Sequence, residues 1–306
     1  MKILTVAFIF LTHVFFFDAF AQAEIKTALK TGPQLDHLEW TIGSDPSFIL
    51  SELIFDSVSM YTEGTVTYYD SGHPWFLETR GGFGHVLSGT VIDTDYLSPG
   101  RANLFSESES SINGHNSLNF EIDVGYRAGL TDRFLSYWLM GFAWNQTRFQ
   151  IIDGVQTKDP FNLTVLGPFS GLNSEYRARW YGPTLGFNVT TSLHPWPYLL
   201  QVDARYWPYV WYEGKGVWNL RSDFMQNPSF IHEATGYGGD IQIRLRHFLS
   251  NGFVLELGYS GMYLRASDGT DTTFFSSGTV STIPFLNAAQ NSHFFHIGVE
   301  LIWGHG

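Results

Sequence analysis

The sequence predicts an all-β protein: a transmembrane antiparallel β-barrel of about ten strands, with short periplasmic turns and long extracellular loops. Three observations support this fold class. The 306 residues are 17% aromatic and only 15% charged, against about a quarter charged residues in ordinary soluble domains. The mean hydropathy of −0.06 excludes a bundle of transmembrane helices, which need runs of about 20 apolar residues. Many segments alternate apolar and polar residues, as strands with two different faces do.

The first element is a secretory signal peptide at residues 1–21. Lys2 supplies a positive start, an apolar core runs from Ile3 to Phe17, and Ala19-Phe20-Ala21 forms a small-x-small cleavage pattern. The core is shorter than the roughly 20 residues that a transmembrane helix needs. We therefore expect export, followed by a single barrel domain over residues 22–306.

Ten strands are expected in the rest of the chain, near 35–43, 47–55, 58–69, 117–129, 135–149, 176–191, 198–213, 236–248, 253–266 and 292–303. The third of them is expected to continue past residue 69, because 76–92 is again strand-like. Short connections at 130–133, 193–197 and 249–252 contrast with long polar or glycine-rich stretches at 69–117, 150–176, 214–236 and 267–291. Short turns at one end and long loops at the other are typical of outer-membrane barrels.

The polar faces of these strands distinguish a membrane barrel from the alternative, a secreted soluble β-sandwich or jelly roll. They mix acidic and basic residues with small Gly and Ala, as a crowded barrel interior requires, whereas the apolar faces carry aromatic residues near the strand ends, as lipid-facing girdles do. Charges in a narrow lumen need partners. We therefore expect pairing across the lumen among Asp203, Arg205, Arg244, Arg246 and Glu256.

Composition also limits the function. Lys and Arg number 17 and Asp and Glu 29, so the formal net charge is −12, which disfavours nucleic acid as a partner. The chain has no Cys, which excludes disulfides and thiolate catalysis. Its 11 His are scattered without metal-ligand spacing, so we expect no metal site and no cofactor. We expect a monomer in the outer membrane of a Gram-negative-type cell, in contact with outer-membrane lipid.

Three segments resemble the omptins, a family of ten-stranded outer-membrane aspartyl-type proteases, over nearly the whole mature chain. Gln34-Leu35-Asp36 through Trp40 is similar to the family's opening strand. Residues 89–96 carry its hydrophobic-Asp-x-Asp-aromatic arrangement, and residues 176–187 its basic-x-Arg-aromatic start and Pro-x-x-Gly finish. The resemblance implies that Asp93 and Asp95 are catalytic residues on the second extracellular loop, facing an Asp and a His on the opposite wall that activate a water.

The opposite half of the omptin catalytic set is missing. Gly216 and Trp218 stand where omptins keep the Asp and the His. The nearest His-acid pair, His232-Glu233, would reach the site only if its loop folded back. Ser111 stands at the family's second His, although Glu107 occupies the position of its Asp. Loss of a general base costs about 10²–10⁴ in rate. We therefore expect that the barrel has lost omptin proteolysis.

Asp93 and Asp95 have two other interpretations. An acidic pair on a long exposed loop is often only solvated. With Glu107 or Glu109 it could also hold a divalent cation, since hard cations favour several carboxylates.

Arg179, and with a spacing two residues off Arg148, match omptin arginines that bind the phosphates of lipid A on the outer wall. The resemblance therefore implies a lipopolysaccharide site, since Arg contacts phosphate well. The alternative for Arg179 is an inward side chain paired with an acid.

Three functions remain open. The first is a non-proteolytic barrel whose loops bind an extracellular protein or peptide, with Trp207, Trp211 and Trp218 as candidate anchors. The second is an endopeptidase that uses Asp93 and Asp95 with an unrecognised base. The third is a small pore.

Overall fold

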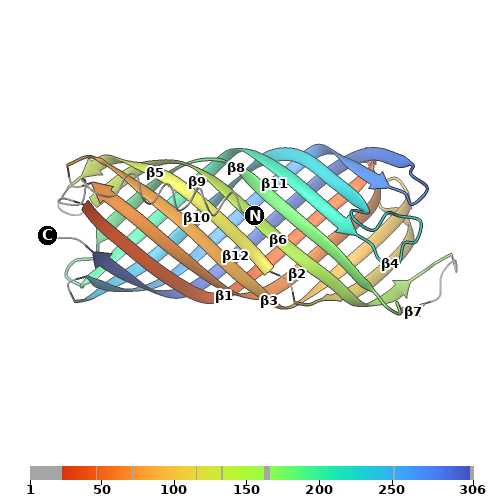
Figure 1. The fold of residues 1–306 in the computed structure, drawn as a ribbon, viewed down its shortest axis with the longest axis horizontal. Coiled ribbons are helices and arrows are strands. Elements are labelled where there is room, and N and C mark those ends of the chain that lie inside the picture. Colours follow the sequence, from red (N-terminus) through yellow and green to blue (C-terminus); the bar gives the residue numbers. More distant parts are fainter. Residues whose placement is uncertain are drawn as a thin grey trace.

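The chain forms a closed antiparallel β-barrel in a computed structural model that describes residues 23–45, 47–70, 72–114, 116–131, 134–161, 166–250 and 252–303 (Figure 1). Its strands are β1 (Ala23–Asp45), β2 (Phe48–Asp70), β3 (Trp75–Ser98), β4 (Ala102–Ile112), β5 (Asn116–Leu130), β6 (Phe134–Lys158), β7 (Gly167–Pro168), β8 (Asn173–Ser192), β9 (Tyr198–Val217), β10 (Phe230–Ser250), β11 (Phe253–Phe274) and β12 (Val280–Trp303). The predicted signal peptide, 1–21, lies outside the described residues. Within those residues, no helix is long and apolar enough to cross a membrane.

The described strands occupy ten positions around the ring. β1 pairs with β2 on one side and with β12 on the other, which closes the barrel. β4 and β5 share one position, because both lie between β3 and β6. The two-residue β7 pairs with the outer end of β6. The predicted barrel of about ten strands is confirmed.

The predicted strand boundaries are wrong in the first third of the chain. The expected strands 47–55 and 58–69 are one strand, β2, and the expected loop 69–117 contains β3 and β4. Asp56 and Ser57 look in the sequence like a turn between two strands, but β2 continues through them. They lie where β2 leaves the lipid belt, so the polar Asp56 side chain faces outward without a turn. The other three long loops are also shorter than expected, since β6, β9, β11 and β12 extend into them.

Glycines in β3 explain why this strand resembles a loop. A Cβ at Gly82 would lie 1.9 Å from the Tyr61 hydroxyl, and one at Gly84 would lie 2.2 Å from the Ser117 hydroxyl. These positions therefore need glycine because large side chains cross the narrow lumen in front of them, and not because the backbone turns.

The barrel wall has a lipid-facing belt and an outer part that extends beyond it. Outward apolar side chains are exposed along the half of each long strand nearest the short turns, as at Phe120, Val124, Met140 and Ile297. A membrane-spanning strand needs about 9–11 residues, whereas β6 has 25. Outward side chains turn mostly polar in 38–57, 88–112, 145–180, 212–236 and 264–292. These ranges form the outer part, which carries β4 and β7 at one end of the barrel (Figure 1).

The barrel interior is layered. The outer part is filled by a buried aromatic core, in which Trp40, Phe55, Tyr176 and Trp180 take part. Charged side chains fill the layer below, at the level of the lipid belt; we call this layer the waist. A smaller apolar cluster around Phe76 lies nearer the short turns.

The lumen contains ion pairs in the waist, as expected, but of the three predicted cations only Arg244 pairs with acids of the predicted set, Asp203 and Glu256. Arg205 Nε lies 2.6 Å from Glu121 Oε1, Arg244 pairs with Asp203 and, at 4.0 Å, with Glu256, and Arg246 pairs with Glu300. All five residues predicted to pair across the lumen are buried in it.

Candidate functional site

The outer end of the barrel holds a cleft built from two adjoining cavities of about 270 and 180 Å³. Asp93 and Asp95 on β3 line both of them. The opposite wall of the smaller cavity carries His232 on β10 and Asp271 on β11. β3 and β10 lie five positions apart in the ten-position ring, so the cleft spans the full width of the barrel mouth.

Asp93 and Asp95 lie in strand β3, not in a loop as expected. Alternation along the strand directs both carboxyl groups to the inner face. The Ser51 hydroxyl donates to Asp93 at 3.5 Å, and the Ser106 hydroxyl donates to Asp95 at 2.8 Å. Burial raises the pKa of Asp93 well above its usual value, and the neighbouring Asp95 carboxylate adds to the shift. The pair is therefore built into the cleft wall, and one member favours its protonated form.

The segment from Trp218 to Ser229 covers one side of the cleft. The Asn219 side chain anchors its start, since Oδ1 accepts from the Asn173 backbone N–H at 2.8 Å and Nδ2 donates to the Gly171 carbonyl at 2.8 Å. Arg221, which is paired with Asp223 at 2.7 Å, lines both cavities. Its guanidinium opposes the rise in the pKa of Asp93. The cleft thus combines two carboxyl groups and one cation.

His232 reaches the cleft from an unexpected strand. It is the third residue of β10, where its neighbours across the ladders are Gly214 on β9 and Asp271 on β11. The sequence predicted that His232 could reach the site only if its loop folded back, but His232 lies in a strand and no such loop is needed. His232 Nδ1 lies 3.0 Å from the Tyr176 hydroxyl, and Nε2 lies 3.4 Å from Asp271 Oδ1.

His232 is held as part of the aromatic core. Its ring lies 4.6 Å from Trp40 and 4.5 Å from Phe285 between centroids, and the residue is 1% exposed. Burial lowers its pKa, although Asp271 opposes the shift. The Tyr176 hydroxyl also contacts the Tyr212 hydroxyl. Both imidazole nitrogens therefore face protein groups, although Nε2 makes no hydrogen bond within the protein.

The remaining omptin-matched positions do not form a second catalytic group. Gly216 lies beside Phe230 in the ladder, and a Cβ there would meet the Phe230 ring at 2.0 Å. Glu107 pairs with Lys158 at 2.7 Å, on the face of β4 opposite the cleft-lining Ser106 and Ser108. The described residues contain no group of three or more His, Cys, Asp or Glu that could hold a metal ion, so the divalent-cation interpretation of Asp93 with Glu107 or Glu109 has no structural support.

The arginines expected to bind lipid phosphates lie on the outside of the barrel wall. Arg179 donates to Glu213 at 2.9 Å and to Gln146 at 2.7 Å, and Arg148 pairs with Glu175. The inward alternative for Arg179 is wrong, because the inward side chains of β8 here are Tyr176, Ala178 and Trp180, all of them buried.

Sequence reasoning missed two cations of the same wall, Arg177 and Lys215, although Arg177 lies only two residues before Arg179 on β8. Together, Arg148, Arg177, Arg179 and Lys215 form a surface that we call the basic wall. Arg177 Nε has no hydrogen-bond partner, and burial, with neighbouring cations, lowers the pKa of this residue.

The three tryptophans expected as anchors do not form one surface. Trp207 is buried in the lumen, where its Nε1 donates to Asp240 at 2.8 Å. Trp211 is exposed on the outer wall and stacks at 5.5 Å on Tyr181. Only Trp218 lines the cleft.

The fold and the cleft together define an omptin-like outer-membrane β-barrel. The chain belongs to the family of Protochlamydia outer membrane proteins (Pom), whose model matches residues 28–301. Membership of this family assigns the chain to the outer membrane, and the fold that it shares with a solved outer-membrane barrel agrees.

Solved structures that resemble the chain include outer-membrane barrels. The crystal structure of the outer membrane protease OmpT from Escherichia coli matches with a TM-score of 0.79 at 10% identity, over 94% of this chain and 99% of that chain. The outer membrane protein OprG from Pseudomonas aeruginosa matches with a TM-score of 0.38 at 9% identity, over 94% and 99%. At such low identity the likeness to OmpT shows the fold alone. No curated protein sequence matches the chain.

Proposed function

We propose that the chain is a non-proteolytic surface barrel, acting as a monomer, whose outer cleft binds an extracellular peptide or an exposed segment of a protein. The observation that carries the proposal is the state of the only His on the cleft wall among the described residues. His232 Nδ1 faces Tyr176 and Nε2 faces Asp271, and the ring is almost fully buried. A general base must reach the water that it deprotonates, and the burial of His232 between Tyr176 and Asp271 disfavours that role, although its Nε2 makes no hydrogen bond.

The lining of the cleft fits a peptide backbone. Ser108 offers a hydroxyl group along one wall, where Ser106 and Gln156 already donate within the protein and offer their oxygens as acceptors. Leu172 and Trp218 offer apolar contacts. Ligand sites commonly combine an apolar lining with a few placed polar groups. The carboxyl pair and Arg221 add charges of both signs, which suits a segment with polar side chains.

The experiment is a screen of a peptide library with the refolded barrel, reading binding and cleavage in the same samples with lipopolysaccharide present. We expect bound peptides to be recovered intact, and binding to fall about tenfold or more in an Asp93→Asn/Asp95→Asn variant. Glu109→Gln, on the same end of the barrel, is the matched control and should bind as the unchanged chain does. Binding that is equal in all three proteins would refute the proposal.

An endopeptidase is the second candidate, favoured by one observation. His232 and Asp271 line the same cavity as Asp93 and Asp95, so an acid with a raised pKa and a His-Asp pair face each other across one space. Cleavage that vanishes in both the Asp93→Asn/Asp95→Asn variant and a His232→Gln variant would establish this candidate in place of the first.

We also propose that the basic wall binds the phosphates of lipopolysaccharide. Four cations stand against two carboxylates, Glu175 and Glu213, on this wall. The Arg177 Nε without a partner leaves a donor for a phosphate oxygen, and Arg contacts phosphate with more than one N–H. The wall lies just outside the lipid belt, at the level where lipid head groups are found.

A further inference from the structure

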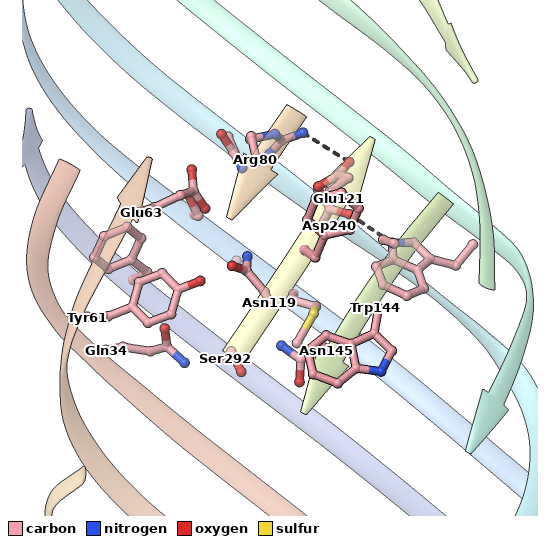
Figure 2. Close-up of a pocket in the computed structure, with 18 residues that line it drawn as sticks. Gln34, Tyr61, Glu63, Arg80, Asn119, Glu121, Trp144, Asn145, Asp240 and Ser292 are labelled. Carbon is pink, nitrogen blue, oxygen red and sulfur yellow. Dashed lines mark hydrogen bonds and ion pairs between the residues drawn. The ribbon is translucent and has the colours of Figure 1, made fainter. Parts of the chain in front are cut away.

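A separate cavity lies inside the barrel waist, below the two cavities of the outer cleft. Its volume is about 80 Å³, large enough for a small number of water-sized particles. Figure 2 shows side chains from opposite walls that converge on it, with Arg80 hydrogen-bonded to Glu121 at one edge and Asn119, Asn145 and Ser292 near its centre. The cavity takes no part in any of the functions proposed above.

The charged side chains around this cavity do not balance. Ion pairs of 4.0 Å or less join Lys30, Arg80, Arg205 and Arg244 to Glu63, Glu78, Glu121, Asp123, Asp203, Asp240 and Glu256. Four bases against seven acids give 4 − 7 = −3 in formal charge. Buried charge without compensation is costly, so the waist attracts protons or cations.

The cavity is also lined by acceptors that have no donor. Asn145 Oδ1 and Gln242 Oε1 are buried and make no hydrogen bond within the protein, and Asn119 Oδ1 makes none of good geometry although the Tyr61 hydroxyl lies beside it. Gln242 is 5% exposed and comes from β10, whereas Asn119 and Asn145 are ladder partners on β5 and β6. Carbonyl oxygens therefore approach the cavity from two different walls. Because an unpaired buried acceptor is costly, three such oxygens around one cavity indicate that the cavity binds an electron-pair acceptor, such as a cation.

We propose that the waist cavity binds a monovalent alkali cation, Na⁺ or K⁺, through the carbonyl oxygens of Asn119, Asn145 and Gln242, with the nearby carboxylates supplying the net negative charge. Carbonyl oxygens are the ligands that membrane proteins use for these ions. A divalent ion fits less well, because the described residues contain no metal-binding group of three acidic or His side chains and the Arg80 guanidinium lines the same cavity. Such an ion would tie β5 and β6 to β10 across the lumen.

The test is the thermal unfolding midpoint of the refolded full-length barrel in detergent, measured in NaCl, in KCl and in choline chloride at equal ionic strength. Choline is too large for the cavity but screens surface charge equally. We expect a higher midpoint in NaCl or KCl that saturates with concentration, and loss of this difference in Gln242→Met. Gln290→Met is the matched control, since Gln290 is also a buried lumen residue with an unpartnered Oε1 but lies outside this cavity.

If Gln242→Met does not refold, Asn145→Ala on the opposite wall replaces it in the same comparison. Soaking crystals with Tl⁺ gives an independent readout, with anomalous density expected beside Asn119 and Asn145. Equal midpoints in all three salts would overturn the proposal and leave a water-filled cavity. A cation-dependent difference of the same size in Gln242→Met, Asn145→Ala and the unchanged chain would overturn it too, since the ion would then bind elsewhere.

Discussion

Arg205 is the residue on which the charged waist depends most. Its guanidinium lies 2.6 Å from Glu121, 3.0 Å from Asp123 and 3.4 Å from Asp240, and the residue is 5% exposed. Arg205→Ala would leave these three carboxylates to Arg80, which already pairs with two of them. The variant thus converts a paired cluster into one with buried, unpaired negative charge.

The expected cost of Arg205→Ala follows from that change. Removing one partner of a buried ion pair typically destabilises a protein by about 3–5 kcal/mol, because the other charge stays buried. Arg205 lies within 3.4 Å of three carboxylates and within 3.8 Å of a fourth, Glu78, so we expect a loss at the upper end of this range. A double variant, Arg205→Met/Asp123→Asn, removes a cation and an anion together and should lose less than the single variant, because packing is kept and one uncompensated charge is removed.

The assay is a urea titration of the barrel refolded into lipid vesicles, read by the electrophoretic shift of the folded form. Arg127→Ala, an exposed arginine on β5 near the short turns, is the control and should leave the midpoint unchanged. A loss below about 1 kcal/mol for Arg205→Ala, or a double variant less stable than the single one, would refute the view that ion pairing governs the stability of the waist.

Three further predictions follow from the same geometry. Burial raises the folded-state pKa of Asp93 above its ordinary value of 3.8. The contribution of Asp93 to the free energy of unfolding is therefore fully present below pH 3.8, and it is lost as the pH rises through the folded-state pKa. Asp93→Asn should therefore stabilise the barrel more at pH 8 than at pH 4 in urea titrations, and a pH-independent effect would contradict this. Arg177→Glu should weaken lipopolysaccharide binding several-fold in a pull-down with labelled lipid, whereas Arg265→Glu on β11 should not; equal binding would exclude the basic wall. Arg80→Ala/Arg205→Ala should raise conductance in planar bilayers above that of the unchanged chain, and equal conductance would show that the waist is not the narrowest point.

The sequence predicted the wall of the barrel better than its outer part. Within the lipid belt, the solvent outside is hydrocarbon and the lumen is polar, so alternation between residues such as Phe120 and Glu121 identifies both strand and face. Beyond the belt, both faces of a strand meet polar surroundings or a mixed core. The two faces exchange character there, since apolar side chains such as Tyr176 point inward and polar ones such as Arg177 point outward. Glycine and serine, as at 88–89 and in 106–111, resemble a loop in sequence although they lie in strands.

The candidate site was predicted only on one wall. Asp93 and Asp95 carry a local motif, whereas the opposite wall is assembled from two strands whose pairing is invisible in a single sequence. The ladder places His232 beside Gly214 and Phe230 beside Gly216. The His on this wall therefore comes from β10, although the omptin resemblance places it on β9. Ladder register, and not spacing along the chain, decides which side chains share a cleft.

The surroundings of His232 support the proposal that the cleft lacks a working general base. At position 214, a Cβ would lie 2.2 Å from the Tyr176 hydroxyl, so glycine there makes room for Tyr176 to reach His232 Nδ1. Tyr212 supports that hydroxyl from behind, and Asp271 faces the other nitrogen. The Tyr and Asp that would orient a catalytic His lie beside its two ring nitrogens here, but Nε2 makes no hydrogen bond and His232 lines the smaller cavity. In the proposed binding function, these contacts stabilise the floor of the cleft, and Asp93, Asp95 and Arg221 are the charged groups that contact the ligand.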